Sequence, residues 1–326
     1  SNRGVAVFLH IDGYASQKFS KTIKQELQDA GVQFKFFEPI LKSSHFYFGR
    51  RLHHKVVVAD GLFSLVGGIN VSNRYNSLSE STPWLDVALY CEGEAPCQRY
   101  QICRQHWKRK TKDIVSKDDI ESFCNTIPQD ERQFVRVRRN DWVKRKSEVW
   151  NTYRGLFRDS KKSITIMTSY FLPGRLFLRL LSKAVLRGVK VKVILAGQSD
   201  VMLSKHAERY LYDYLLVTNI EIYEYQPTVL HAKITVCDSE WVTVGSFNVN
   251  NISAYASLEF NMDVKDKSFG NFVEDELSKI ISENCIRITA ENYKRSTNVF
   301  KRIWQKISYS IVNAILTLFT FYFKQE

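Results

Sequence analysis

The sequence lacks two features that would place it in familiar protein classes. Its six cysteines include no C-x-x-C pair, so the ligand spacing of a zinc site is absent. We expect all six to be reduced thiols in a cytosolic setting. Long hydrophobic runs are also missing, because the apolar run from Ile311 to Phe323 has 13 residues, short of the roughly 20 that cross a bilayer. A zinc-stabilised fold and a membrane-spanning tail are therefore both disfavoured.

Positively charged residues outnumber negatively charged ones. The chain of 326 residues has 47 Lys and Arg against 34 Asp and Glu, which gives a formal net charge of +13. Such an excess favours an anionic partner, whether nucleic acid, an anionic membrane or a phosphate-bearing substrate, and a merely solvated basic surface is the alternative. The length suggests about two domains.

A repeated motif is the most informative feature of the chain. Segments His53–Asp60 and His231–Asp238 both read H-x-K, four further residues, then D. An asparagine follows each histidine at the same interval, Asn70 in the first copy (70 − 53 = 17) and Asn248 in the second (248 − 231 = 17). Two copies with one spacing indicate an internal duplication.

The spacing has a mechanical explanation. The residues after each lysine are β-branched, which is typical of strands. Alternate residues of a strand share a face, so His53 and Lys55 point to the same side, as do His231 and Lys233. Each pair can converge on one anion, and the two asparagines can donate hydrogen bonds to phosphate oxygens.

These paired motifs, each followed by Gly-Gly or Gly-Ser ahead of the asparagine, resemble the phospholipase D superfamily and, within it, the bacterial cardiolipin synthases. The resemblance covers nearly the whole chain. It implies two similar halves related by a pseudo-two-fold axis, with one site between them. The segments that carry it most closely are Arg51–Lys55, Gly67–Asn70, Ser169–Gly174, Leu230–Lys233 and Val244–Asn248.

Alternating strand and helix patterns predict an α/β fold in which each half is a mixed, mostly parallel sheet flanked by helices. We expect a first half over residues 1–110, a linker over 111–133, a second half over 134–290 and a basic-apolar tail over 291–326.

The two halves are not expected to be equally complete. Arg187 follows a predicted strand (163–168) and helix (176–186), whereas the matching Arg3 follows only two residues. We therefore expect the first half to lack its opening strand and helix, and any membrane anchor ahead of them would lie outside this chain.

The tail is predicted to be an interfacial membrane helix anchored by Trp304, Tyr309, Tyr322 and nearby basic residues. A helix docked on its own domain is the alternative. The first interpretation predicts a protein peripheral to the cell membrane on its cytoplasmic side.

The resemblance also implies the chemistry. One histidine forms a covalent phosphohistidine, and the other protonates the leaving alcohol and deprotonates the incoming one. By resemblance His53 is the nucleophile and His231 the acid/base, although the sequence itself is symmetric. Asp86 and Glu259 suit the role of orienting the rings. The natural pairing is Asp86 with His53 and Glu259 with His231, despite unequal intervals (86 − 53 = 33; 259 − 231 = 28).

The remaining motif residues complete the expected site. Lys55 and Lys233 neutralise the charge that grows on phosphorus, so we expect neither a metal nor another cofactor. Asp60 and Asp238, the acids of the two motifs, are counted with the catalytic set and are expected to hold structure or orient neighbouring groups rather than to touch phosphorus.

The predicted function is phosphatidyl transfer between phospholipids, with phosphatidylglycerol or a related lipid as substrate and an anionic membrane as partner. A phosphodiesterase that hydrolyses lipid or nucleic acid is one alternative. Nucleic acid is disfavoured because the single-motif members that cleave it build their site by dimerising, whereas both motifs lie in this chain. An inactive membrane-binding scaffold is the other alternative, opposed by the presence of every expected catalytic residue in both copies.

Overall fold

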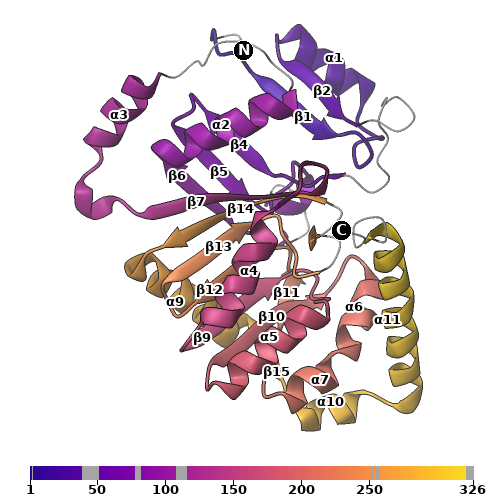
Figure 1. The fold of residues 1–326 in the computed structure, drawn as a ribbon. Helices are drawn as coiled ribbons and strands as arrows, with labels where there is room; N and C mark the ends of the chain where they lie inside the picture. The colour runs from indigo at the N-terminus through magenta and orange to yellow at the C-terminus, as the bar shows by residue number, and fades with distance from the viewer. Residues whose placement is uncertain are drawn as a thin grey trace.

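The computed structural model describes residues 1, 3–38, 51–77, 82–107, 116–250, 253–254 and 257–320. These residues form two sheet-containing halves that meet along a shared interface. The amino-terminal half is at the top of Figure 1 and the larger carboxy-terminal half lies below it.

The first half contains two small sheets, a parallel pair and a three-stranded antiparallel sheet. The pair consists of β1 (Phe8–Asp12) and β2 (Gln33–Phe37), and the antiparallel sheet of β4 (Val56–Ala59), β5 (Phe63–Gly67) and β6 (Ala88–Glu92). The helices of this part are α1 (Lys21–Asp29), α2 (Glu94–Trp107) and α3 (Lys117–Thr126). The last of these helices lies within the segment expected to be a linker.

The second half is built on a ten-stranded sheet. Nine strands follow one another in space as β15 (Cys285–Ile288), β11 (Glu221–Val229), β10 (Lys190–Gln198), β9 (Ser163–Thr168), β12 (Lys233–Cys237), β13 (Trp241–Gly245), β14 (Ser257–Lys265), β7 (Phe134–Asp141) and β8 (Lys146–Ser147). The tenth strand, β3 (Arg51–Leu52), comes from the first half and pairs with β14. The two halves therefore share a sheet.

Helices flank this sheet on both faces (Figure 1). They are α4 (Glu148–Asp159), α5 (Arg175–Leu186), α6 (Met202–Tyr210), α7 (Tyr212–Val217), α9 (Lys267–Asn284), α10 (Ala290–Ser296) and α11 (Val299–Thr320). Short 3-10 helices span Asn73–Tyr75, Gln129–Glu131 and Trp142–Lys144.

The α/β fold with a mixed sheet and flanking helices is confirmed, but the expectation that the sheet is mostly parallel is wrong. Parallel pairing in the large sheet is confined to β9, β10 and β11 and to the contact of β3 with β14. The other neighbours are antiparallel. The reason is visible between β12 and β13, where a three-residue turn is far too short for a crossover helix. Asp238 and Ser239 take positive φ angles of 56° and 51° in that turn.

The internal duplication is visible in the topology. The β4–β5 hairpin repeats as β12–β13, and the parallel pair β1–β2 repeats as β10–β11. Strand β9 lies between β10 and β12 in the second half. It has no counterpart among the described residues of the first half, where β1 and β4 belong to separate sheets.

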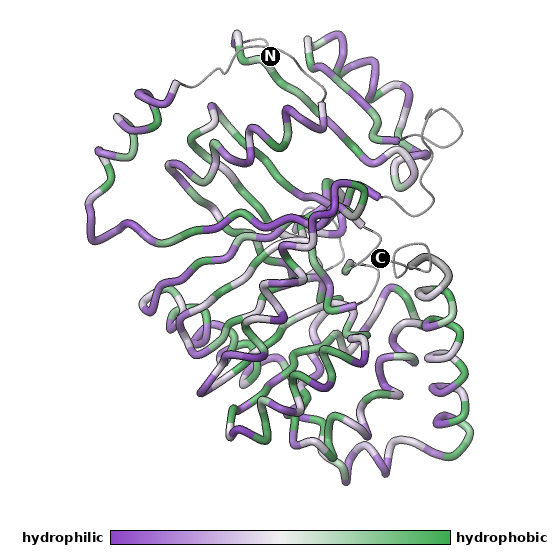
Figure 2. The backbone as a smooth tube through the Cα atoms, viewed as in Figure 1, coloured by the Kyte–Doolittle hydropathy of each residue, from purple (hydrophilic) through white to green (hydrophobic). Residues whose placement is uncertain are grey.

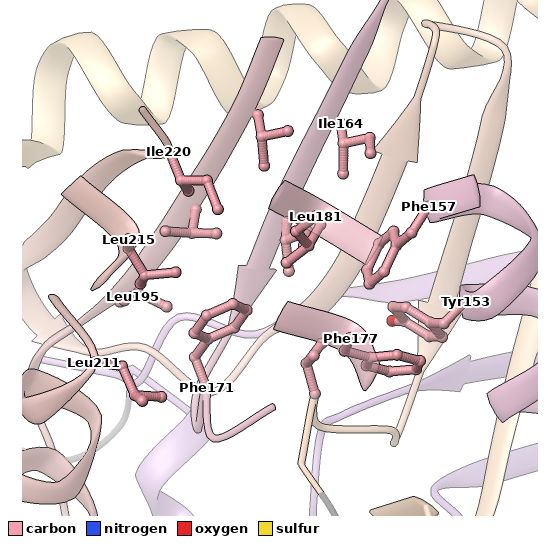
Figure 3. Close-up of a cluster of buried hydrophobic side chains, with 14 of the residues drawn as sticks. Tyr153, Phe157, Ile164, Phe171, Phe177, Leu181, Leu195, Leu211, Leu215 and Ile220 are labelled. Atoms are coloured by element: carbon pink, nitrogen blue, oxygen red, sulfur yellow. The ribbon is translucent and has the colours of Figure 1, made fainter. Parts of the chain in front are cut away.

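The largest core lies in the second half, between the sheet and the helices α4, α5 and α7 (Figure 3). Aromatic rings fill much of it: Trp150 and Phe177 stack with centroids 4.0 Å apart, and Tyr153 lies 4.9 Å from Phe247. Because Phe247 directly precedes Asn248, this packing fixes the segment that carries one of the predicted phosphate ligands.

Helix α11 is docked along one face and exposed along another. It packs beside α6, where the rings of Tyr309 and Tyr210 lie 4.9 Å apart and Gln305 and Ser308 are buried. Tyr322 lies outside the described residues. No helix in the described part of the chain is both long and apolar enough to span a membrane. Large apolar residues of α11 remain exposed away from the buried Gln305 and Ser308: Val299, Phe300, Ile303, Trp304, Ile307, Ile311 and Ile315. Figure 2 shows hydrophobic residues recurring along this helix.

Candidate active site

Backbone hydrogen bonds between the halves bring the two motifs together. The His53 amide donates to the carbonyl of Leu258 at 3.1 Å, and the His231 amide donates to the carbonyl of Leu85 at 2.7 Å. Leu258 and Leu85 directly precede the two acids, Glu259 and Asp86. Each histidine segment is thus laid beside the acid-bearing segment of the other half.

The histidines pair with carboxylates across this interface. His53 Nδ1 lies 2.9 Å from Glu259 Oε2, and His231 Nδ1 lies 2.7 Å from Asp86 Oδ2. The predicted pairing of Asp86 with His53 and of Glu259 with His231 is therefore wrong. Distance along the chain did not decide the partners, because the parallel contacts between the halves exchange them.

Burial controls the protonation of both rings. The Glu259 carboxylate is fully buried and that of Asp86 is nearly so, whereas the His53 side chain is 31% exposed and that of His231 10%. Burial, followed by the charge of Lys233, lowers the pKa of His231 to about 4, although the hydrogen bond to Asp86 opposes this. Burial also lowers the pKa of His53, against the charge of Glu259. Both imidazoles are therefore neutral at pH 7, with Nε2 free to react once Nδ1 is held by a carboxylate.

Small residues beside the acids explain the Gly-Gly and Gly-Ser sequences. Gly68 and Ser246 are equivalent positions (68 − 53 = 15; 246 − 231 = 15). A Cβ on Gly68 would lie 2.4 Å from an Asp86 carboxylate oxygen, so any side chain there would displace the carboxylate. The Ser246 hydroxyl instead donates to Glu259 and accepts from the Phe260 amide at 3.0 Å. These residues hold the orienting acids in place.

The two lysines lie beside the histidines. Lys55 Nζ donates to the His53 carbonyl at 2.9 Å, and Lys233 Nζ donates to Ser169 Oγ at 2.8 Å and to the His231 carbonyl. Burial lowers the pKa of Lys55 to about 8 and that of Lys233 to about 7. An anion bound between them would favour their charged forms. Among the described residues, no group of three or more His, Cys, Asp or Glu side chains is arranged to hold a metal.

The two asparagines are not equivalent. Asn248 is buried, and its Oδ1 accepts from Ser169 Oγ at 2.9 Å, which ties it to Lys233. Asn70 is exposed, and its Nδ2 donates to the Tyr75 hydroxyl at 3.0 Å.

Tyr75 is a site residue that the motif analysis missed. Its hydroxyl lies 3.2 Å from His231 Nδ1, on the nitrogen that also meets Asp86. The sequence contained a weak signal for it, because the equivalent position in the second copy is Ser253 (75 − 53 = 22; 253 − 231 = 22). A large polar aromatic residue in one copy only marks a difference between the two histidines.

Asp60 and Asp238 do not belong to the site, and counting them with the catalytic residues is wrong. They lie at the ends of β4 and β12 that are farther from the histidines, both with positive φ in the turn that follows. The Asp238 carboxylate accepts backbone N–H groups of Lys161, Lys162 and Ser163 at 2.7 to 3.1 Å. It therefore tethers the start of β9 to the hairpin turn, a structural role.

Comparison with known proteins agrees with this geometry. Residues 153–281 match the family described as "Cardiolipin synthase, PLD-like domain". The chain is 28% identical to cardiolipin synthase B of Escherichia coli (strain K12), over 96% of this chain and 74% of that protein. It is 29% identical to a cardiolipin synthase of Halalkalibacterium halodurans, over 88% of this chain and 58% of that protein.

The fold is also found in a solved structure. The crystal structure of phosphatidylserine synthase from Haemophilus influenzae Rd KW20 superposes with a TM-score of 0.70 at 14% identity, over 96% of this chain and 82% of that one. The duplicated motif, the paired histidines and these similarities lead to one conclusion: residues 153–281 form a PLD-like domain of the cardiolipin synthase family, and the chain as a whole is similar to the bacterial cardiolipin synthases.

Proposed function

We propose that this protein is a cardiolipin synthase, which transfers the phosphatidyl group of one phospholipid to a hydroxyl of another. The observation that carries the proposal is the pair of histidines, each held by a buried carboxylate and accompanied by a lysine. The relatives that match most of the chain have this activity in their names.

In the proposed reaction the donor phosphodiester lies between the two histidines. Nε2 of His53 attacks phosphorus, the bond from phosphorus to the head-group oxygen breaks, and His231 gives that oxygen a proton. The acceptor hydroxyl then gives its proton to His231 as its oxygen attacks phosphorus, and the phosphorus–nitrogen bond breaks. The choice of His53 as nucleophile rests on the family resemblance. An anionic substrate raises the pKa of the nearby imidazoles, which supplies the protonated form that the first step needs.

The other polar groups stabilise charge as phosphorus becomes five-coordinate. Lys55 and Lys233 are cations when an anion is bound between them, and Asn248 is held rigidly through Ser169. Asn70 reaches the same region through Tyr75. Because these groups are already in position before substrate binds, little reorganisation is required in the transition state.

The protein is further proposed to work at the surface of an anionic membrane, peripherally and on the cytoplasmic side. Support comes from the exposed apolar face of α11, defined above, and from the basic residues that accompany it, Lys301 and Lys306. A helix that is docked along one face and apolar along another can lie in the interface without leaving its domain.

Mass spectrometry of lipids after incubation with phosphatidylglycerol vesicles tests the proposed activity. We expect cardiolipin and glycerol from the protein and neither product from its His231→Ala variant. Phosphatidic acid without cardiolipin would make the protein a hydrolase instead. No lipid turnover by the folded protein would overturn the proposal. Thermal unfolding of both proteins serves as the folding control.

A further inference from the structure

One side of the site carries polar and aromatic side chains that the proposed reaction does not use. We call them the His231-side cluster: Arg74, Tyr75, Trp84, Tyr170 and Asp200. The rings of Tyr75 and Trp84 lie 5.6 and 6.0 Å from that of His231. The guanidinium of Arg74 lies 4.7 Å over the Trp84 ring. The first half of the chain thus contributes three members of the cluster.

The second half contributes a carboxylate and a phenol. Tyr170 follows Ser169, the residue that bonds Lys233, just beyond the carboxyl end of β9. Asp200 follows the carboxyl end of β10, the parallel neighbour of β9. The Tyr170 hydroxyl donates to Asp200 Oδ1 at 2.5 Å, and the Asp200 side chain is exposed. The carboxyl edge of parallel strands is where such sheets bind ligands.

The charges of the two contributions influence one another. Burial raises the pKa of Tyr75, and the negative charges of Asp86 and Asp200 raise it further. Burial and the bond to Asp200 raise the pKa of Tyr170, which Tyr75 and Arg74 also influence. Burial lowers the pKa of Lys233, and the negative charge of Asp200 opposes that lowering. The cluster is therefore continuous with the lysine beside His231.

Among the described residues, the other histidine, His53, has no matching cluster. Ser253 stands at the position of Tyr75, and Ser257 at that of Trp84, two residues before the acid in each copy (86 − 84 = 2; 259 − 257 = 2). Besides Glu259, which holds the ring, the described acid near His53 is Asp12, bound to the amide of Leu52. It already accepts from the amides of Tyr14, Ala15 and Leu52 at 2.7 to 3.0 Å and from Arg51. In the part of the chain that the structure describes, the groups able to bind a ligand are thus concentrated at His231.

The chemistry of the cluster fits one kind of ligand. Because the Tyr170 hydroxyl gives its proton to Asp200, the phenol oxygen and the second carboxylate oxygen can each accept a hydrogen bond from an alcohol hydroxyl. Arg74, held over an indole, presents a guanidinium suited to a phosphate. The neighbouring cations Lys233 and Arg74 disfavour an ammonium head group. A glycerol unit that carries its own phosphodiester satisfies all three conditions.

We propose that the His231-side cluster is the subsite from which the first alcohol leaves and in which the acceptor alcohol then binds, and that this subsite selects a glycerol head group. Tyr170 and Asp200 bind the hydroxyl that does not react, and Arg74 binds the phosphate of an acceptor phospholipid. The acceptor's reacting hydroxyl gives its proton to His231 as its oxygen forms the new bond to phosphorus and the phosphohistidine bond breaks. This inference rests on the proposed transferase function and on His231 as the acid/base.

Competition between soluble acceptors tests the subsite. Phosphatidylglycerol vesicles are the donor, and deuterated glycerol, ethanol and ethanolamine compete as acceptors while mass spectrometry measures each phosphatidyl product. We expect the protein to prefer glycerol to ethanol and to form little phosphatidylethanolamine. Asp200→Asn and Tyr170→Phe should each lower the glycerol-to-ethanol product ratio by roughly tenfold, as expected when a hydroxyl-binding site loses its partner. The ratio is internal to each variant, so partial loss of folded protein does not change it.

Arg74→Ala provides the second readout. It should lower the yield of cardiolipin relative to deuterated phosphatidylglycerol, because only the lipid acceptor carries a phosphate. Asp275→Asn and Tyr90→Phe, exposed on α9 and β6, are the matched controls and should keep both ratios.

The outcomes separate the two proposals. Transfer to alcohols with no preference for glycerol, or with wild-type ratios in the cluster variants, would overturn the subsite and leave the transferase function intact. A clear preference for ethanolamine would also overturn it. If no acceptor yields a phosphatidyl alcohol, the transferase function fails and the subsite fails with it.

Discussion

Each histidine of the site depends on a carboxylate from the other half of the chain. Asp86→Ala should therefore disturb His231, and Glu259→Ala should disturb His53. Nitrogen NMR of the imidazoles measures the effect directly, because loss of the acceptor frees the Nδ1 proton to exchange between ring nitrogens. We also expect each variant to lose roughly 10²- to 10⁴-fold in kcat, as for other histidines that lose an orienting acid.

The control for this prediction is Asp60→Ala, an acid of the motif that lies away from the site. It should leave both sets of imidazole signals unchanged. Disturbance of His53 by the Asp86 variant, with His231 unaffected, would contradict the exchanged pairing.

The two lysines predict an unusual pH profile. Burial lowers the pKa of Lys233 to about 7 and that of Lys55 to about 8, so the free enzyme loses these cations as the pH rises through that range. Bound phosphodiester stabilises the charged forms and raises both values. We expect kcat/KM, which reports the free enzyme, to fall above about pH 7 to 8, and kcat to fall only at higher pH. Initial rates across the pH range provide the test. If kcat/KM and kcat declined at the same alkaline pH, the prediction would be contradicted.

Residue identities were more predictable than residue partners. The spacing from histidine to lysine and to asparagine identified His53, Lys55, His231, Lys233 and Asn248 as neighbours. It could not identify which acid meets which histidine, because that depends on how two distant segments pack. Tyr75 could not be predicted from the features common to both copies, because Ser253 stands at the equivalent position of the second copy.

At the scale of elements, replacing glycine by alanine should have different effects on stability and activity at three positions, two beside the hairpin strands and one in α4. A Cβ on Gly245 would lie 2.1 Å from the Phe260 carbonyl oxygen, so Gly245→Ala should lower the free energy of unfolding by about 1–3 kcal/mol. Gly68→Ala displaces the Asp86 carboxylate and should reduce activity more than stability. Gly155 lies within α4 with nothing within 4 Å of the added atom, so Gly155→Ala should stabilise by up to about 1 kcal/mol.

Chemical denaturation of the three variants measures these differences. Equal stabilities for Gly245→Ala and Gly155→Ala would contradict the close backbone approach at the hairpin.

Helix α11 allows a direct test of the membrane surface. Ile303 and Ile307 are 51% and 44% exposed on its apolar face. Replacing both with Glu should weaken flotation with phosphatidylglycerol vesicles roughly tenfold or more, since buried apolar area and attraction to anionic lipid both fall. Thermal stability should change little because neither side chain is in the core.

The matched control is Leu186→Glu, an exposed leucine at the end of α5. It should bind vesicles like the unmodified protein. If the α11 variant bound equally well, the membrane would have to dock elsewhere.

The sequence predicted where elements lie better than how they pack. Residues 33–37 form the expected strand, and the expected helix over 176–186 forms one residue longer, as α5. Strand direction was missed because alternating strands and helices continue only as far as β11, after which a hairpin follows. The two interpretations of the tail are compatible, since Gln305 and Ser308 of α11 face the domain while Ile303 and Ile307 face solvent.

At the scale of the whole molecule, the net charge of +13 predicts how membrane binding responds to salt. Raising the ionic strength from about 0.05 to about 0.5 M shortens the range of the attraction and should weaken binding to phosphatidylglycerol vesicles about tenfold or more. Vesicles of neutral phosphatidylcholine should bind weakly at both concentrations. Binding that is strong and independent of salt would contradict a contribution from the net charge.

The exchange of carboxylates between the halves has a consequence for the newly made chain. Neither half alone can align its imidazole, so a partly folded molecule has no competent nucleophile to direct at the surrounding lipids. The His53 pair requires β3 to join β14, and the His231 pair requires Leu85 to meet the strand end before His231. The arrangement makes an aligned site conditional on contact between the two halves.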